Sequence, residues 1–503
     1  MKAFPLSSPQ RRLWFLHAVD PSGFRHSTRR EFVVDGPLDL ETLTVALGSL
    51  VRRHEPLRTT YHLGSDGPYQ CISPHLPVTV RVSEDRPEPE PFVLEVDPPL
   101  RVVVQPTGPD SHSITFFIHL LAADGWANRI LLTELSEFYS AAVENRSASL
   151  RPISAQYIDW AEWVAERLTE ARRNELLAWW TAELSDLPLM LPACVRQTGQ
   201  ESGECVRAAL PGHLMDSVRA VARNRQRTVF PVLAAAWSVV IHGQYGARRF
   251  PIGVAVANRD HADVHQTLGF FVDTIPLRID LADDPTFGQL VDRIADRTVA
   301  AYEHRQLPFE WLVDHLSPPR EAARSPIVQV CLAHHPAGSL GSLNLAGCVS
   351  SEVELASPAK FELTLRVVDH EDGSSTAWLE FDNSLVDAGQ ADAMLHGFHD
   401  VLRRITELTD TRVTALFEVD STATVIAAVF SDVLGLPTIG VHDDFFALGG
   451  TSMGLVQVVA RVRHVLGTKL DLGILLARPT PSGAAALATS SPQPGARPTG
   501  RTP

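Results

Sequence analysis

Residues 114–126 place groups capable of chemistry at the end of an apolar run. The run is rich in β-branched and aromatic residues and ends at His119, after which a turn of small residues leads to Asp124 and Gly125. This pattern predicts a strand that delivers polar groups to the mouth of a cavity. His119 and Asp124 are candidates for a general base, although a carboxylate that follows a buried strand also requires a partner.

A second candidate residue is Ser452, which follows Gly449, Gly450 and Thr451. The residues after it place an apolar stripe on one helical face: Leu455, Val458, Val459, Val462, Val465 and Leu466. Thr451 and Ser452 suit a helix start, and the two glycines allow the backbone to turn tightly before it. An exposed serine there could carry a phosphodiester, because free N–H groups and the helix dipole favour negative charge.

The elements around these residues mix strands and helices. The patterns predict strands at residues 78–82 and 250–256 and an apolar helix near residues 229–242. Residues 155–185 are predicted to form one helix, because tryptophan and leucine recur near helical spacing. The patterns therefore predict a large region that mixes strands and helices.

The length of 503 residues predicts several domains, because it exceeds what one hydrophobic core supports. Residues 409–418 are short and polar and predict a linker, and residues 419–488 predict a small helical unit. Residues 489–503 are rich in Pro, Gly and Ser and are predicted to be disordered, because they cannot bury a core.

Composition excludes several classes of function. Lys and Arg number 44 against 59 Asp and Glu, and the resulting net charge of −15 argues against nucleic-acid and anionic-membrane partners. We find no signal segment and no window that approaches a membrane span. The five cysteines lack metal-type spacing, so we expect free thiols, no metal and a cytoplasmic location.

Residues 119–125 resemble the His-His-x-x-x-Asp-Gly signature of non-ribosomal peptide synthetase condensation domains. Further segments resemble the other motifs of that family in family order: 8–16, 53–59, 157–163, 253–259, 269–278, 304–310 and 324–329. The resemblance implies two chloramphenicol-acetyltransferase-like α/β lobes that form a V, which we place at residues 1–180 and 181–408. In the family a tunnel runs between the lobes, and a carrier arm can enter from each side.

Residues 443–452 resemble the attachment motif of peptidyl carrier proteins, Asp-x-Phe-Phe-x-Leu-Gly-Gly-x-Ser, at every specified position. The resemblance implies that residues 419–488 form a four-helix-bundle carrier domain. It also implies that Ser452 covalently carries 4′-phosphopantetheine, whose thiol holds an aminoacyl or acyl thioester.

The condensation signature is degenerate at Leu120, which stands where the family has its catalytic histidine. Along a strand, Phe116, Ile118 and Leu120 would share one face, and His119 would lie on the other. His119 is then expected to point away into a hydrogen-bonded structural role. Its use as a base would require a bulge or a register slip.

The remaining site residues are assigned by the same resemblance. The family pairs the motif aspartate with an arginine, so we expect Asp124 to bind Arg259 and to organise the turn rather than act as a base. Gly125 is expected to keep a channel for the pantetheine arm free of side chains. The expected site therefore consists of His119, Leu120, Asp124, Gly125 and Arg259, with Ser452 as the cofactor attachment residue.

Loss of the histidine leaves the activity open. A general base contributes about 10²–10⁴-fold, whereas positioning two reactants can contribute about 7–11 kcal/mol. We therefore expect an amide-forming acyltransferase with a non-standard site. The alternatives are a catalytically silent scaffold that presents the loaded carrier to a tailoring enzyme, and acyl transfer to a free small-molecule acceptor.

The partners follow from what the sequence lacks. Neither an adenylation motif nor the Gly-x-Ser-x-Gly motif of thioesterases is apparent. We therefore expect a separate adenylation enzyme that loads the carrier in trans and a phosphopantetheinyl transferase that modifies it. Upstream or downstream carrier or synthetase proteins of natural product biosynthesis are also expected, because the domain order suggests a stand-alone or truncated module.

Overall fold

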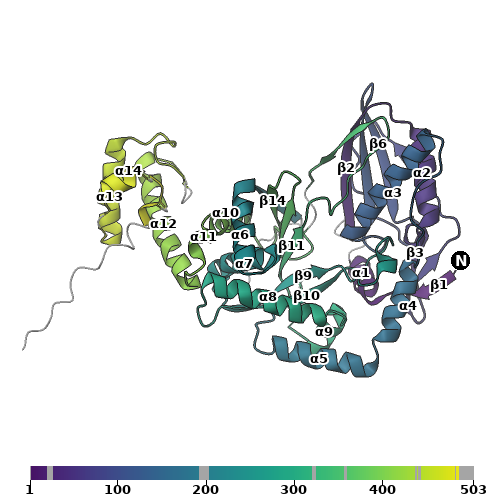
Figure 1. The fold of residues 1–503 in the computed structure, drawn as a ribbon, viewed down its shortest axis with the longest axis horizontal. Coiled ribbons are helices and arrows are strands. Elements are labelled where there is room, and N and C mark those ends of the chain that lie inside the picture. The colour runs from purple at the N-terminus through teal and green to yellow at the C-terminus, as the bar shows by residue number, and fades with distance from the viewer. Residues whose placement is uncertain are drawn as a thin grey trace, which may run out of the picture. The chain divides into compact units, whose positions relative to one another are not determined.

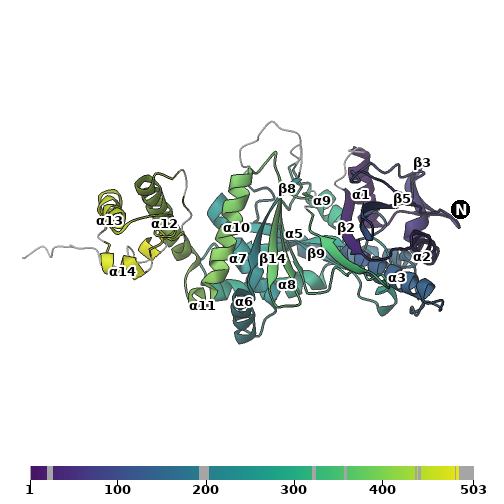
Figure 2. The same cartoon turned by 90° about the horizontal axis from the view of Figure 1, so that it is seen from above.

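The computed structural model describes residues 2–485 apart from 20–25, 192–202, 320–323, 356–358, 437–438, 440–442, 469, 478 and 482. The predicted disordered tail therefore lies outside the described residues. The chain divides into two compact units, Met1–Asp280 with Leu290–Thr406 and Leu281–Gln289 with Glu407–Pro503. Figure 1 and Figure 2 show that two lobes, each built on a sheet, make up the first unit. None of the described helices has both the length and the apolar composition that a membrane span requires.

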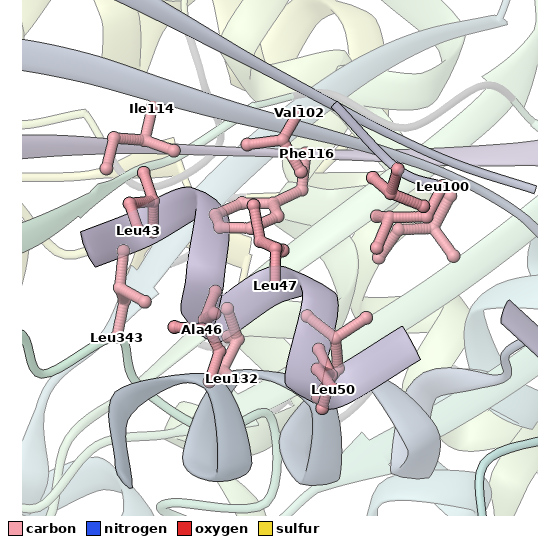
Figure 3. Packing of buried hydrophobic residues seen from close by; sticks show 14 of the residues in the cluster. Leu43, Ala46, Leu47, Leu50, Leu100, Val102, Ile114, Phe116, Leu132 and Leu343 are labelled. Atoms are coloured by element: carbon pink, nitrogen blue, oxygen red, sulfur yellow. The ribbon is translucent and has the colours of Figure 1, made fainter. Parts of the chain in front are cut away.

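The first lobe is built on a five-stranded sheet in the order β12-β2-β7-β6-β5. Its strands are β2 (Ser27–Asp35), β5 (Val80–Val82), β6 (Leu100–Gly108), β7 (Ser111–His119) and β12 (Val349–Val353). Helices α2 (Leu40–Arg53) and α3 (Gly125–Val143) share one apolar core with β6 and β7. Figure 3 shows Leu43 and Leu47 of α2 facing Ile114 and Phe116 of β7. The period of two residues along β7 thus gives this face Ile114, Phe116 and Ile118.

A smaller sheet and four helical segments make up the other described elements as far as residue 184. The sheet has the order β1-β4-β3, with β1 (Lys2–Pro5), β3 (Thr59–Gly64) and β4 (Gly67–Ile72). The helices are α1 (Ser8–Val19), the 3-10 turn η2 (Glu55–Arg58), α4 (Tyr157–Arg167) and α5 (Glu170–Leu184). The prediction of one helix over 155–185 is therefore wrong. Thr169 starts a new helix, because its side chain accepts a hydrogen bond from the backbone N–H of Arg172.

The second lobe contains a six-stranded sheet in the order β10-β9-β11-β13-β14-β8. Its strands are β8 (Gly203–Leu210), β9 (Arg249–Val256), β10 (Asp273–Asp280), β11 (Val330–His335), β13 (Leu363–Asp369) and β14 (Ser375–Asp382). Strands β9, β11 and β13 run parallel. The helices are α6 (Gly212–Asn224), α7 (Val229–Tyr245), η3 (Ala262–Val264), α8 (Phe287–Glu303), α9 (Phe309–Leu316), α10 (Ala388–Arg403) and α11 (Ile405–Leu408).

The two faces of this sheet differ in character. Along β13, Leu363, Leu365 and Val367 are fully buried, whereas Thr364 and Arg366 are half-buried. Helices α6, α7 and α10 pack together, and α10 packs against β8 and β14. Since apolar helix faces pack on apolar sheet faces, these helices cover the buried face, and the other face carries polar side chains that solvent reaches.

The lobes interleave in sequence. Strand β12 lies within the range predicted for the second lobe, yet it pairs antiparallel with β2 in the first lobe's sheet. Arg30 of β2 binds Glu352 of β12 with 2.6 Å between Nη2 and Oε2. Ahead of β12, Gly341 has a φ of +73°, and a Cβ there would lie 2.7 Å from the Cα of Arg129. The lobe boundary at residue 180 therefore stays a prediction.

The second unit contains α12 (Val413–Leu434), α13 (Ser452–Leu466) and α14 (Leu472–Ala477) around a separate apolar core. Helix α12 starts inside the segment predicted as a linker. Within this unit, Asp284 accepts hydrogen bonds from the N–H and hydroxyl of Thr414, at 2.9 and 2.7 Å. The acceptor for the helix start thus comes from a distant loop, which explains why the local sequence does not reveal it.

Candidate functional site

The turn after β7 is organised by Asp124, which is almost fully buried. Its side chain caps α3, accepting a hydrogen bond from the N–H of Ala127 at 2.8 Å. It also accepts one from the N–H of Phe271, in the second lobe, at 3.0 Å. The same carboxylate therefore fixes a helix start in one lobe to a loop of the other.

Arg259 is the charged partner of Asp124, as predicted. Its Nη2 lies 3.2 Å from Oδ1 and 3.4 Å from Oδ2 of the carboxylate, and both side chains are buried. Its Nη1 donates to the carbonyl oxygens of Val264 and Thr267, at 2.8 and 2.7 Å, and its guanidinium lies 3.8 Å from the ring centroid of Phe271. Burial lowers the pKa of Arg259, and the adjacent carboxylate opposes that shift. With its oxygens engaged, Asp124 is arranged as an organiser of the turn.

His119 is the last residue of β7, and its pairing with Ser27 continues a regular register without a bulge. Its Nδ1 accepts a hydrogen bond from the N–H of Leu121 at 3.2 Å, so Nε2 carries the ring proton. The ring contacts His17 and Phe92 edge-on, with centroid distances of 5.2 and 5.7 Å. Burial holds the pKa of His119 well below its ordinary value, and His17 and His26 lower it further. The imidazole is thus a neutral, enclosed side chain.

Leu120 lies one residue beyond the end of β7. It packs in the same apolar cluster as Phe117, whereas Phe116 and Ile118 belong to the core under α2 and α3. The prediction that Leu120 shares a face with Phe116 and Ile118 is therefore wrong, because alternation stops where the strand ends. The rest of the cluster comprises Leu6, Leu13, Tyr61, Phe92, Leu94, Val103 and Leu121, with Trp14 and Phe270 packed against it. Leu120 is 5% exposed, and it offers no group that can accept a proton.

Gly125 is the exposed first residue of α3, and a Cβ built on it would meet no atom within 4 Å. The structure therefore leaves room beside the backbone at this point. A channel for a pantetheine arm along it stays a prediction.

Sequence reasoning missed the part that Tyr157 plays in joining the lobes. Its hydroxyl donates to the carbonyl oxygen of Phe270 at 2.7 Å and lies 2.6 Å from the hydroxyl of Ser7. Gly269, at φ +155°, allows this ring to approach, since a Cβ there would lie 2.2 Å from Tyr157 Cδ2. The available signal was that residues 157–163 and 269–278 both resemble family motifs.

Ser452 is the exposed first residue of α13 in the second unit. Thr451 caps the helix by accepting a hydrogen bond from the N–H of Gly454 at 3.1 Å. Gly449 has a φ of +91°, and a Cβ on Gly450 would lie 2.3 Å from the ring of Phe445. The serine oxygen is therefore presented at an open helix N-terminus, which suits a covalently attached phosphodiester.

Two family models match the chain. The model of the condensation domain matches residues 1–424, and that of the phosphopantetheine attachment site matches residues 424–488. The second match identifies 4′-phosphopantetheine as the covalent cofactor of the C-terminal domain.

Curated relatives are large synthetases. The chain is similar to chondramide synthase cmdD of Chondromyces crocatus, with 32% identity over 76% of this chain and 10% of the relative. It is also similar to tyrocidine synthase 3 of Brevibacillus parabrevis, with 30% identity over 80% of this chain and 6% of the relative. The chain thus spans a tenth or less of the length of these two proteins.

Solved structures share the fold of the first unit. The X-domain in its complex with OxyB from teicoplanin biosynthesis has a TM-score of 0.72 at 22% identity, over 83% of this chain and 96% of that one. The condensation domain of the monacolin K polyketide synthase MokA also gives 0.72, at 19% identity, over 82% of this chain and 99% of that one. These neighbours support the expected α/β architecture of chloramphenicol-acetyltransferase type. The chain belongs to the condensation-domain family of non-ribosomal peptide synthetases and carries a phosphopantetheine attachment domain at its C-terminal end.

Proposed function

We propose that Ser452 holds an aminoacyl or acyl thioester through phosphopantetheine and that the condensation domain binds carrier-bound substrates for amide-bond formation. The observation that carries this proposal is the exposed hydroxyl of Ser452 at a helix N-terminus, in a carrier domain that follows a condensation domain directly. When bound, 4′-phosphopantetheine supplies the thiol that carries the acyl group.

The proposed reaction balances without a side-chain base. The amine nitrogen attacks the thioester carbonyl carbon, the C–N bond forms and the C–S bond breaks. The proton that the amine loses is taken up by the sulfur that leaves. A positioned base would accelerate this step by about 10²–10⁴-fold. The free energy that corresponds to this factor is smaller than the roughly 7–11 kcal/mol that positioning of the two reactants can supply.

The described residues support a positioning role. Asp124 and Arg259 form a buried pair across the two lobes, which holds the turn before α3 in one arrangement. Gly125 leaves space beside the backbone at that turn. Leu120 places an apolar side chain, packed in its cluster, where the family has an imidazole. This site can hold reactants in place and exclude water, and it offers no proton acceptor at residue 120.

The proposed partners follow from the carrier domain. They are a phosphopantetheinyl transferase that modifies Ser452, a separate adenylation enzyme that loads it, and upstream or downstream carrier or synthetase proteins that supply or take the acyl group.

The burial of Leu120 favours a second candidate function. A side chain that is 5% exposed within an apolar cluster supports a role without chemistry at the family's catalytic position. In this alternative the condensation domain is a silent scaffold that presents the loaded carrier to a tailoring enzyme.

The first experiment tests the attachment site. The full chain is treated with a phosphopantetheinyl transferase and coenzyme A, and intact-protein mass spectrometry measures the added group. We expect one addition, lost in Ser452→Ala and kept in Thr468→Ala, a control in the same unit. If the wild type gains no group, or if Ser452→Ala still gains one, the assignment of Ser452 fails.

The second experiment separates the two functions. Holo-protein loaded with an acyl group is mixed with an amine acceptor, either free or on a second carrier, and amide product is measured. Product from wild type and from Leu120→Ala alike supports positioning without a base. No product from wild type, together with product from Leu120→His, supports the scaffold. If product forms with the free amine but not with the carrier-bound amine, the function is acyl transfer to a small-molecule acceptor.

A further inference from the structure

The polar face of the six-stranded sheet carries a row of side chains that the proposed chemistry does not use. Register places Ala333 of β11 opposite Arg366 of β13, Arg366 opposite Trp378 of β14, and Trp378 opposite Arg207 of β8. Residues in such a row project from the same face, and this face is the one opposite the buried Leu365. Arg366 is half-buried and Arg207 is exposed, so solvent reaches the row.

Cations outnumber carboxylates around this row. Arg366 binds Glu380 with 3.2 Å between Nη2 and Oε1, and Arg207 binds Glu354. Lys360 forms no ion pair with any residue that the structure describes. We call these five residues the Arg366 cluster; it holds three cations and two carboxylates.

The two arginines are held in place by Trp378. The guanidinium of Arg207 lies 5.4 Å from its ring centroid and that of Arg366 lies 5.3 Å from it. Among the described residues, Glu380 is the only ionic partner of Arg366. The Nε of Arg366 has no hydrogen-bond partner among these residues. The guanidinium is therefore fixed in position while part of its donor capacity is unused.

The surroundings of Lys360 strengthen its interaction with an anion. The residue is exposed, yet desolvation lowers the pKa of its ammonium, Arg366 lowers it further, and Glu380 opposes both. Burial raises the pKa of Glu380 in spite of the two cations, so this carboxylate is itself incompletely stabilised. A further anion would meet unsatisfied positive charge in partly desolvated surroundings, where charge interactions are stronger than in water.

The cluster lies on the sheet whose strand β9 leads to Arg259. Strands β9, β11 and β13 are parallel, so their carboxyl ends share an edge of the sheet, and Arg259 follows β9 at that edge. Two strand spacings separate β9 from β13, which is about 10 Å. Ala333 of β11 lies on the strand between them, and Ala255 of β9 is exposed.

We propose that the Arg366 cluster binds a carboxylate of the acyl substrate that the carrier delivers. A planar guanidinium beside a second cation matches the geometry and charge of a carboxylate. This inference deepens the proposed function and rests on it, since it names a substrate class for the same condensation domain. The alternative is a cross-strand ion-pair network that only stabilises the sheet.

The test measures binding rather than turnover. Isothermal titration calorimetry of the full chain compares S-succinyl-pantetheine with S-butyryl-pantetheine, which has the same carbon chain without the carboxylate. We expect the succinyl probe to bind at least about tenfold more tightly. Lys360→Gln and Arg366→Gln should remove most of that difference and leave butyryl binding unchanged. Glu380→Gln should increase it.

Arg81→Gln is the matched control, because Arg81 is an exposed arginine paired with Glu90 in the first lobe. Its succinyl preference should equal that of wild type. The inference is overturned if the two probes bind with equal affinity, if the succinyl probe shows no saturable binding, or if its preference survives in Lys360→Gln. The Lys360→Gln variant stays informative if Arg366→Gln fails to fold. Failure of Ser452 to accept its cofactor, with the succinyl preference intact, would instead reject the proposed function alone.

Discussion

Removing the guanidinium in Arg259→Ala should destabilise the first unit by about 3–5 kcal/mol. Breaking a buried ion pair from one side costs about this much. The hydrogen bonds that Arg259 makes support a loss of this size independently. The carbonyl oxygens of Val264 and Thr267 would each lose a donor, at about 1–3 kcal/mol for a buried group. Asp124 would keep two backbone donors, from Ala127 and Phe271, which limits the penalty for its charge.

The assay is urea unfolding followed by tryptophan fluorescence. All nine tryptophans lie between residues 14 and 378 outside 281–289, so the signal reports the first unit alone. Arg249→Ala serves as the control, because Arg249 is 43% exposed and binds Asp186 and Asp280 at the surface. It should cost less than about 1 kcal/mol.

The pair itself is isolated by a double-mutant cycle with Asp124→Asn, in which Arg259→Ala and Asp124→Asn should couple by more than about 1 kcal/mol. A loss below about 1 kcal/mol in Arg259→Ala, at an unchanged denaturant slope, would refute the reasoning that this pair holds the turn.

Two further predictions concern Gly450 and Asp273. Gly450→Ala should destabilise the second unit by about 1–3 kcal/mol, because its Cβ would lie 2.3 Å from the Phe445 ring. Thermal unfolding of the full chain, followed by circular dichroism, checks this. Gly473→Ala is the matched control, because φ is not positive there either and the added Cβ would meet only a side-chain oxygen of Asp471, at 3.2 Å. Burial, and secondarily Glu310, raises the pKa of Asp273 to about 7. Its contribution to stability is therefore present at low pH and lost as pH rises through 7, by about 2–3 kcal/mol between pH 5 and 8. In Asp273→Asn, urea unfolding at these two pH values should show that the loss has disappeared, and an unchanged loss would assign it to other groups.

The sequence predicted the parts of the site that motifs encode locally. Asp124 and Arg259 are 135 positions apart, and the family resemblance paired them where no local pattern could. The prediction from strand alternation was wrong at Leu120, because the apolar run continues past His119 and does not reveal the residue at which the strand ends. The contact of Tyr157 with Phe270 depends on how two lobes meet, and the motifs that contain these residues do not show that they touch. The sequence did not predict the start of α12 for the same reason, since Asp284 supplies the hydrogen-bond acceptor for that helix start from a distant loop.

The position of β12 has a consequence for making the lobes separately. A fragment that ends near residue 180 would lack β12, and β2 would become the edge strand of the first lobe's sheet. An unpaired edge offers a row of backbone donors and acceptors to any other chain, which promotes aggregation. Such a fragment should therefore be insoluble or self-associating, whereas a chain that continues past Val353 supplies its own cover for that edge.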